Sequence, residues 1–128
     1  MRVESVTPML RTWDLQATIE FYKSVLGFEC EAHEPDWGWA RMSYGPGAVM
    51  FSSPNEHEGD IAPSFTGSLY FRISDVDALW LRLKNEARVC YPLETFPYGM
   101  REFAIYDNNG YLLQFGEVIN KNIPVDED

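Results

Sequence analysis

Two small groups of histidine and carboxylate side chains are the first candidates for chemistry in this sequence. His33 is followed by Glu34, and Glu56, His57 and Glu58 are consecutive. Imidazole and carboxylate groups are common metal ligands and general bases. Three consecutive residues on a loop cannot all point inward, however. We therefore expect these side chains to form a solvated acidic surface rather than a metal centre.

Nucleophilic catalysis has no clear signature in the chain. Ser52 and Ser53 have no histidine next to them in the sequence, and neither histidine lies in a recognisable catalytic motif. We expect no catalytic residue, and the sequence favours a protein that is not an enzyme.

An aromatic pair indicates a different chemistry, the binding of a flat ligand. Trp37 and Trp39 are separated by one glycine and follow Asp36 directly. Two such rings could hold a planar heteroaromatic group between them, with the carboxylate beside it. The alternative is that one tryptophan belongs to the core and the other covers it.

Size and charge limit what the protein can do. The chain has 128 residues, 45% of them hydrophobic, which suits one globular domain. Its formal net charge of -10 disfavours nucleic acid and anionic membranes as partners, and it would attract a cationic ligand or simply maintain solubility. The N-terminus lacks the apolar stretch of a signal peptide, and no apolar segment is long enough to span a membrane. With only Cys30 and Cys90 as cysteines, we expect a cytoplasmic protein with reduced thiols.

The elements that must position these residues occur in an order that repeats. Helical spacing follows Asp14 and ends at Gly27, and a second helix begins at Asp75. The segment Asp107–Gly110 is typical of a hairpin turn. The predicted strands are residues 3–12, 28–32, 39–44, 48–52, 67–73, 89–91, 101–106 and 111–116.

Several residues of the first half recur 61 positions later, which indicates an internal duplication. Thr7 and Ser68 share this offset, and so do Arg11 and Arg72. We predict an α+β fold in which two βαβββ modules form curved mixed sheets around a concave pocket. The predicted single domain spans residues 1–128. Module one covers about 3–54, a linker 55–65, module two about 66–117, and a tail that we expect to fray 118–128.

Alternation along the strands predicts which side chains face the pocket. In the strand from 67 to 73, Ser68, Tyr70 and Arg72 share one face. The opposite face, with Leu69 and Phe71, is apolar and should pack under the second helix.

Three segments of the first half of the chain form a recognisable series: Thr7–Leu15, Ile19–Tyr22 and Leu26–Phe28. They are similar to the first module of the vicinal-oxygen-chelate superfamily, which includes glyoxalases, extradiol dioxygenases and bleomycin-resistance proteins. The segment Gly99–Gly110 is similar to the last hairpin of the bleomycin-resistance branch.

The resemblance also places the residues that hold a metal ion in the family's enzymes. Those four positions are occupied here by Thr7, Met50, Ser68 and Gln114. Neutral hydroxyl, thioether and amide groups provide no anionic donor to offset a dication. We therefore expect no metal and no other cofactor. The alternative is a metal-dependent glyoxalase-type lyase or dioxygenase with non-standard ligands.

The bleomycin-resistance branch implies a metal-free homodimer that exchanges its first strand and sequesters a drug in grooves. Pro8 is consistent with a hinge for that exchange, although it could equally be an edge-strand proline. The implied partner is a small molecule, such as an antibiotic with cationic and aromatic groups. Arg11 could contact such a ligand or pair with acidic side chains instead. The candidate ligand-binding residues are Trp37, Trp39, Met50, Tyr98, Met100, Phe103, Gln114 and Arg11.

Overall fold

The computed structural model describes residues 1–57, 59 and 62–119. The chain divides into two compact units. Unit 1 contains Met1–Phe65 and also the hairpin tip Asn108–Gly110, and unit 2 contains the remainder from Thr66 onward. Within the described residues, no helix has the length and apolar character needed to cross a membrane. The acidic end of the predicted tail, from residue 120, lies outside the described residues.

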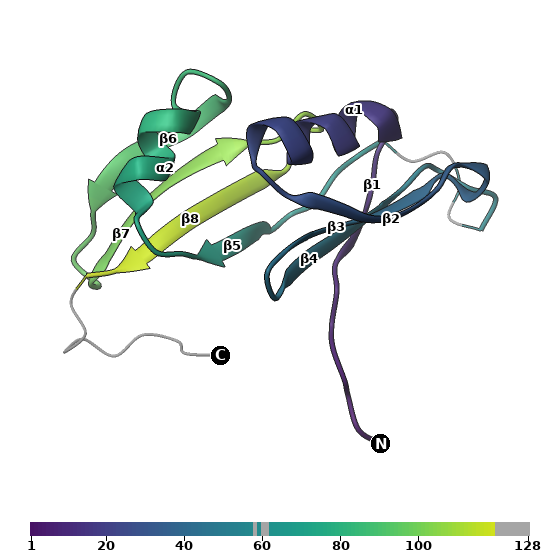
Figure 1. The fold of residues 1–128 in the computed structure, drawn as a ribbon, viewed down its shortest axis with the longest axis horizontal. Coiled ribbons are helices and arrows are strands. Elements are labelled where there is room, and N and C mark those ends of the chain that lie inside the picture. The colour runs from purple at the N-terminus through teal and green to yellow at the C-terminus, as the bar shows by residue number, and fades with distance from the viewer. Residues whose placement is uncertain (58, 60–61, 120–128) are drawn as a thin grey trace. The chain divides into compact units, whose positions relative to one another are not determined.

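Unit 1 is a four-stranded mixed sheet with a helix. Its sheet has the order β1-β4-β3-β2, in which β1 is parallel to β4 and the other pairs are antiparallel (Figure 1). Its elements are β1 (Met9–Arg11), α1 (Leu15–Glu20), the π-helical turn η1 (Phe21–Val25), β2 (Glu29–Glu34), the 3-10 turn η2 (Pro35–Trp37), β3 (Trp39–Tyr44) and β4 (Gly47–Ser52).

Unit 2 repeats this arrangement. Its sheet has the order β5-β8-β7-β6, again with one parallel pair, β5 with β8, and two antiparallel pairs. The predicted α+β fold with the βαβββ order in each module is confirmed. The elements of unit 2 are β5 (Ser68–Arg72), α2 (Val76–Leu83), β6 (Arg88–Thr95), β7 (Met100–Tyr106) and β8 (Leu112–Val118).

Each sheet packs one apolar face against its own helical segment. In unit 1 the ring of Tyr22 lies 4.9 Å from that of Phe51, and both are fully buried. In unit 2 the ring of Phe103 lies 5.2 Å from that of Trp80 on α2 and is stacked on Phe115. Because side chains alternate along a strand, the residues between these apolar ones lie on the opposite face of each sheet. That opposite face is the one available for polar chemistry.

The predicted strand boundaries needed two main corrections. The first strand was predicted over residues 3–12 but β1 spans only Met9–Arg11. Val3 and Val6 are exposed, so the segment before Pro8 buries no face that would hold it in a sheet. The strand predicted at 89–91 is longer, Arg88–Thr95, and tolerates Pro92 because β6 is an edge strand.

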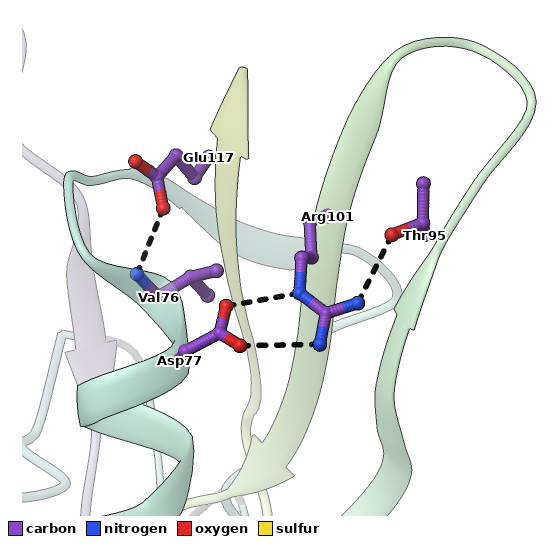
Figure 2. Close-up of polar contacts among 5 residues, drawn as sticks. All are labelled: Val76, Asp77, Thr95, Arg101 and Glu117. Carbon is purple, nitrogen blue, oxygen red and sulfur yellow. Dashed lines mark hydrogen bonds and ion pairs between the residues drawn. The ribbon is translucent and has the colours of Figure 1, made fainter. Parts of the chain in front are cut away.

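The two helices begin in different ways. Asp14 caps α1, since its Oδ1 accepts a hydrogen bond of 3.0 Å from the Ala17 backbone N–H. Asp75 occupies the equivalent position before α2, but it has a positive φ of 57° and makes no capping hydrogen bond. There the carboxylate of Glu117 on β8 accepts the Val76 N–H at 3.0 Å (Figure 2).

A second contact attaches α2 to the sheet. Arg101 on β7 donates two hydrogen bonds to the carboxylate of Asp77, at 2.9 and 3.2 Å, and a third to Thr95 (Figure 2). The hydrogen bonds from Arg101 lower the pKa of the Asp77 carboxyl group below its ordinary value. Strand β8 and strand β7 thus each fix one point of the first turn of α2.

Candidate functional site

A hydrogen-bonded chain of polar side chains runs across the sheet of unit 2 on the face away from α2. It starts on β5, where the Ser68 hydroxyl donates to Gln114 Oε1 at 2.5 Å. The amide Nε2 of Gln114, on β8, donates in turn to the hydroxyl of Tyr91 at 2.9 Å. Tyr91 on β6 donates to Glu102 Oε2 at 2.5 Å. Four strands therefore contribute to one network.

Three phenols converge on the carboxylate of Glu102, which is only 2% exposed. Besides Tyr91, the hydroxyls of Tyr70 and Tyr98 donate to Glu102 Oε1 at 2.8 and 2.9 Å. We call Tyr70, Tyr91, Tyr98 and Glu102 the tyrosine–glutamate cluster. Three O–H donors directed at two oxygens suit an ionised carboxylate, which can only accept hydrogen bonds.

Strand register explains how residues distant in sequence meet in this cluster. Glu102 pairs with Gly116 across β7 and β8, and Tyr70 pairs with Gln114 across β5 and β8. Gly116 leaves the space that the Tyr70 ring occupies, since a Cβ there would lie 2.9 Å from Tyr70 Cζ. A side chain at this position would therefore displace the ring.

Tyr98 reaches the cluster from the turn between β6 and β7. That turn is closed by backbone hydrogen bonds from Phe96 to Met100 and from Gly99 to Phe96. The ring of Phe96 stacks on that of Tyr98 at 5.4 Å and meets Tyr91 edge-on at 5.9 Å. Stacking fixes the orientation of the Tyr98 ring, so its hydroxyl points at the carboxylate.

Burial and the neighbouring carboxylate keep these phenols protonated. Burial is the larger cause that raises the pKa of Tyr98, to about 12, and the hydrogen bond to Glu102 raises it further. The same two causes, in the same order, raise the pKa values of Tyr70 and Tyr91. At neutral pH the three hydroxyl groups around Glu102 are therefore protonated.

The equivalent face of unit 1 has different chemistry. Met9 pairs with Met50 where unit 2 has Tyr70 with Gln114, and Trp39 pairs with Ser52 where unit 2 has Glu102 with Gly116. Thioether and indole groups replace the phenols and the carboxylate. The duplication is thus visible in the register of the strands, although the side chains have diverged.

Two arginines occupy this face of unit 1. Arg11 donates to the Ser52 hydroxyl at 2.6 Å, and Arg41 pairs with Glu31 at 3.1 Å. Arg41 also donates to the Thr7 hydroxyl at 3.4 Å. Both arginines thus have protein partners on or beside the sheet.

The residues at the four positions that the resemblance assigns to metal ligands do not fit a divalent cation. Ser68 and Gln114 are hydrogen-bonded to each other, and Thr7 accepts from a guanidinium group that would repel a dication. Met50 offers only a thioether. Elsewhere in the described part of the chain, no group of three or more His, Cys, Asp or Glu side chains could hold a metal ion.

The sequence-predicted ligand residues divide between the two units. Tyr98 and Gln114 belong to the network around Glu102, and Met100 is 6% exposed with its Cε 3.1 Å from where a Gly116 Cβ would lie. Phe103 is completely buried against α2, on the face of β7 opposite to Glu102, and so does not border the cluster. The remaining candidates, all in unit 1, are Arg11, Trp37, Trp39 and Met50.

The two tryptophans of unit 1 differ in exposure. Trp37 ends the turn η2 and is 75% exposed, whereas Trp39 opens β3 and is half-buried. His33, Glu34, Glu56 and His57 are exposed, and Glu58 lies outside the described residues.

Sequence reasoning missed Tyr91 and Glu102, and it placed Tyr70 on the pocket face of its strand without naming it as a ligand residue. One signal was present: Glu102 interrupts an otherwise largely apolar strand, Met100–Tyr106. A carboxylate in such a strand needs buried hydrogen-bond donors, and tyrosines on neighbouring strands can supply them.

Comparisons with known proteins agree with this fold. A family model described as "Glyoxalase/Bleomycin resistance protein/Dioxygenase superfamily" matches residues 4–115. No curated protein matches the sequence. A glyoxalase/bleomycin resistance protein/dioxygenase from Nocardioides is similar in structure, with a TM-score of 0.77 at 18% identity over 100% of this chain and 92% of that one.

Two further solved structures have names with more specific functions. The bleomycin resistance determinant encoded on the transposon Tn5 has a TM-score of 0.69 at 22% identity, over 90% of this chain and 98% of that one. A lactoylglutathione lyase from Agrobacterium tumefaciens has a TM-score of 0.69 at 22% identity, over 91% and 96% of the two chains. At such identities the similarity shows the fold alone.

Proposed function

Because the chain belongs to the glyoxalase/bleomycin resistance protein/dioxygenase superfamily, we propose that it binds a small organic molecule without a metal ion and without turnover. In this proposal it acts by sequestration, as an antibiotic-binding protein would. One observation carries the proposal: Ser68 and Gln114, at two family metal positions, are hydrogen-bonded to each other, and Gln114 also donates to Tyr91 of the cluster around Glu102. Their side-chain oxygens are engaged in hydrogen bonds of this polar network instead of coordinating a cation.

Charge supports a cationic ligand. The chain has a net charge of -10, and the described residues form a carboxylate-centred network on the open face of unit 2. In unit 1, the exposed Trp37 separately offers a ring on which an aromatic group could stack. Bleomycin, which carries both cationic and aromatic groups, is the first ligand to test.

We further propose that the protein is a cytoplasmic homodimer with an exchanged first strand. Residues 1–6 are exposed, and β1 is short and pairs only with β4 in the sheet order. Both cysteines are free, as expected for a reducing compartment. Light scattering of the full chain should give twice the monomer mass, and deletion of residues 1–6 should reduce the dimer fraction.

The binding proposal is tested by titrating bleomycin into the purified protein while the tryptophan fluorescence is followed. We expect a saturable change at micromolar drug. An unchanged signal would remove bleomycin as the ligand.

The competing function is a metal-dependent lyase or dioxygenase. Protein stripped with a chelator is reloaded with nickel, zinc, manganese or iron, and bound metal is measured by elemental analysis. We expect no stoichiometric metal. One metal per chain together with lactoylglutathione formation would overturn the proposed function.

A further inference from the structure

We propose that the tyrosine–glutamate cluster is a binding subsite for an organic ammonium group, such as the primary amine of a small ligand. The inference rests on the proposed function and names the chemical group that unit 2 recognises. It assigns Tyr70, Tyr98 and Glu102 as the residues that select a positive charge.

The first argument is an uncompensated buried charge. The carboxylate of Glu102 is 2% exposed, and its hydrogen-bond partners are three neutral phenols. Among the described residues, Glu102 forms no ion pair with Lys, Arg or His. A buried carboxylate without a cationic partner is costly for the protein alone, and a cation nearby would offset that cost.

The second argument is the direction of the hydrogen bonds. Tyr70 and Tyr98 each donate the hydroxyl proton inward to Glu102, so the lone pairs of these two oxygens remain for a donor that approaches from outside. Donation to a carboxylate also increases the negative charge on the phenol oxygen, which makes it a better acceptor. The buried charge is thereby presented at the surface through Tyr70 and Tyr98.

The third argument is the accessibility of the rings. Tyr70 is 45% exposed and Tyr98 is 48% exposed, while the carboxylate beneath them is buried. Faces of aromatic rings attract organic cations, and Phe96 extends this surface by stacking on Tyr98. An ammonium group on an organic stem fits both features, since its N–H groups can bond the phenol oxygens and its stem can contact the rings.

The experiment compares benzylammonium with benzyl alcohol, a neutral probe of similar shape, on the full chain. Binding is followed by NMR of ring-labelled tyrosines, at probe concentrations up to about 10 mM, as expected for a fragment-sized ligand. We expect saturable shifts of the Tyr70 and Tyr98 signals with benzylammonium, and at least tenfold weaker binding of benzyl alcohol. Equal binding of the two probes, or shifts confined to other tyrosines, would overturn the proposal.

Glu102→Gln removes the charge and nearly preserves the shape. We expect it to weaken benzylammonium binding at least tenfold and to leave benzyl alcohol unaffected. Glu29→Gln is the matched control, because it removes one exposed carboxylate from β2 in unit 1 and should not change either affinity. Unchanged affinity in a folded Glu102→Gln protein would overturn the proposal.

If Glu102→Gln does not fold, the half-exposed Tyr98 provides the second variant. Tyr98→Phe retains the ring and its stacking but removes one acceptor oxygen, and we expect about threefold weaker benzylammonium binding. No loss of affinity in this variant would contradict the assignment of Tyr98.

Bleomycin titrations separate the subsite from the proposed function. If the drug binds wild-type and Glu102→Gln proteins equally well and benzylammonium binding does not depend on Glu102, the binding function stands and the subsite is overturned. If benzylammonium binds in a Glu102-dependent manner although bleomycin does not bind, the subsite is supported and only the drug is excluded.

Discussion

Two consecutive residues of β7 have opposite environments, and the difference decides what each can do. Glu102 lies among phenols on the open face, whereas Phe103 lies in the apolar core against Trp80. The alternation of faces along a strand was predictable from the sequence, as Ser68, Tyr70 and Arg72 show. Phe103 was named as a candidate ligand-binding residue without regard to this alternation, which places its side chain on the face that packs against α2.

The convergence of the three tyrosines could not be predicted. Tyr70, Tyr91 and Tyr98 come from β5, β6 and the turn after β6, and they meet only because of the strand order β5-β8-β7-β6. Long-range pairing is not encoded in local spacing. By contrast, the positions of Ser68 and Gln114 followed from the repeat and from the last hairpin, and the two side chains do lie together.

Replacement of Gly116 should destabilise the protein even when the new residue is alanine. In Gly116→Ala, the new Cβ would lie 2.9 Å from Tyr70 Cζ and 3.1 Å from Met100 Cε. We expect the free energy of unfolding in urea to fall by about 1–3 kcal/mol, as for overpacking in a close-packed site.

Two controls make this measurement specific. Gly47→Ala introduces a Cβ that meets only the Tyr44 backbone oxygen, at 3.4 Å, and should be nearly neutral. In a Tyr70→Ala background the cost of Gly116→Ala should largely disappear, because the ring that it displaces is gone. Equal costs with and without the Tyr70 ring would contradict this explanation.

The cluster should also be visible in an alkaline titration of the phenols. The pKa of Tyr98 is raised from 10.0 to about 12, first by burial and then by Glu102. The folded state holds the Tyr98 proton more tightly than the unfolded state does. The protonated phenol therefore stabilises the folded protein below pH 10, and this contribution is lost as the pH rises toward 12. Ultraviolet absorbance of phenolate should therefore include a late component, and Tyr98→Phe should reduce it. A late component of the same amplitude in Tyr98→Phe would exclude Tyr98 as its source.

At the level of elements, the sequence predicted the order of strands and helices better than their ends. Predicted strand 39–44 coincides with β3, and Gly27 follows the first helical segment with a positive φ of 83°, as a glycine there was expected to do. The first strand was too long in the prediction because an extended, exposed segment has the same local composition as a strand. Pairing with a neighbouring strand, not composition, determines where β1 begins.

The two helix starts predict effects of different size when their aspartates are replaced. Asp14→Ala removes the cap of α1 and should cost about 1 kcal/mol of unfolding free energy. Asp75→Gly should change stability by less than about 0.5 kcal/mol, because Asp75 makes no cap and glycine accepts its positive φ of 57°. Glu117→Ala should cost about 1 kcal/mol, since Glu117 is the residue that caps α2.

Urea denaturation of the three variants measures these differences. Each variant removes one carboxylate, so a change in net charge affects all of them equally. A loss of stability in Asp75→Gly as large as that in Asp14→Ala would show that sequence position, and not the observed hydrogen bond, determines the cap.

At the scale of the whole molecule, the two units show the same register with different side chains. Met9 and Trp39 of unit 1 stand where unit 2 has Tyr70 and Glu102. The offset of 61 residues revealed the duplication in the sequence, but it could not reveal that only one copy had acquired a buried carboxylate. That difference depends on which side chains face each other across strands.

The net charge of -10 should make the binding of cations depend on salt. Raising NaCl from about 20 to about 500 mM screens the acidic surface, so the affinity for benzylammonium should fall several-fold. Benzyl alcohol is the control and should bind with an affinity that does not fall. Calorimetric titrations at the two salt concentrations measure both, and a salt-independent affinity for benzylammonium would show that long-range charge contributes nothing.

Gly116 has a consequence for the history of the protein. The ring of Tyr70 occupies the volume that any side chain at position 116 would need. A lineage that acquired this tyrosine after it already carried the glycine avoided that clash, and a later loss of the glycine would destabilise the protein as long as the ring remained. Among relatives, a large residue at position 70 should accompany glycine at 116, so that these two positions evolve as one character.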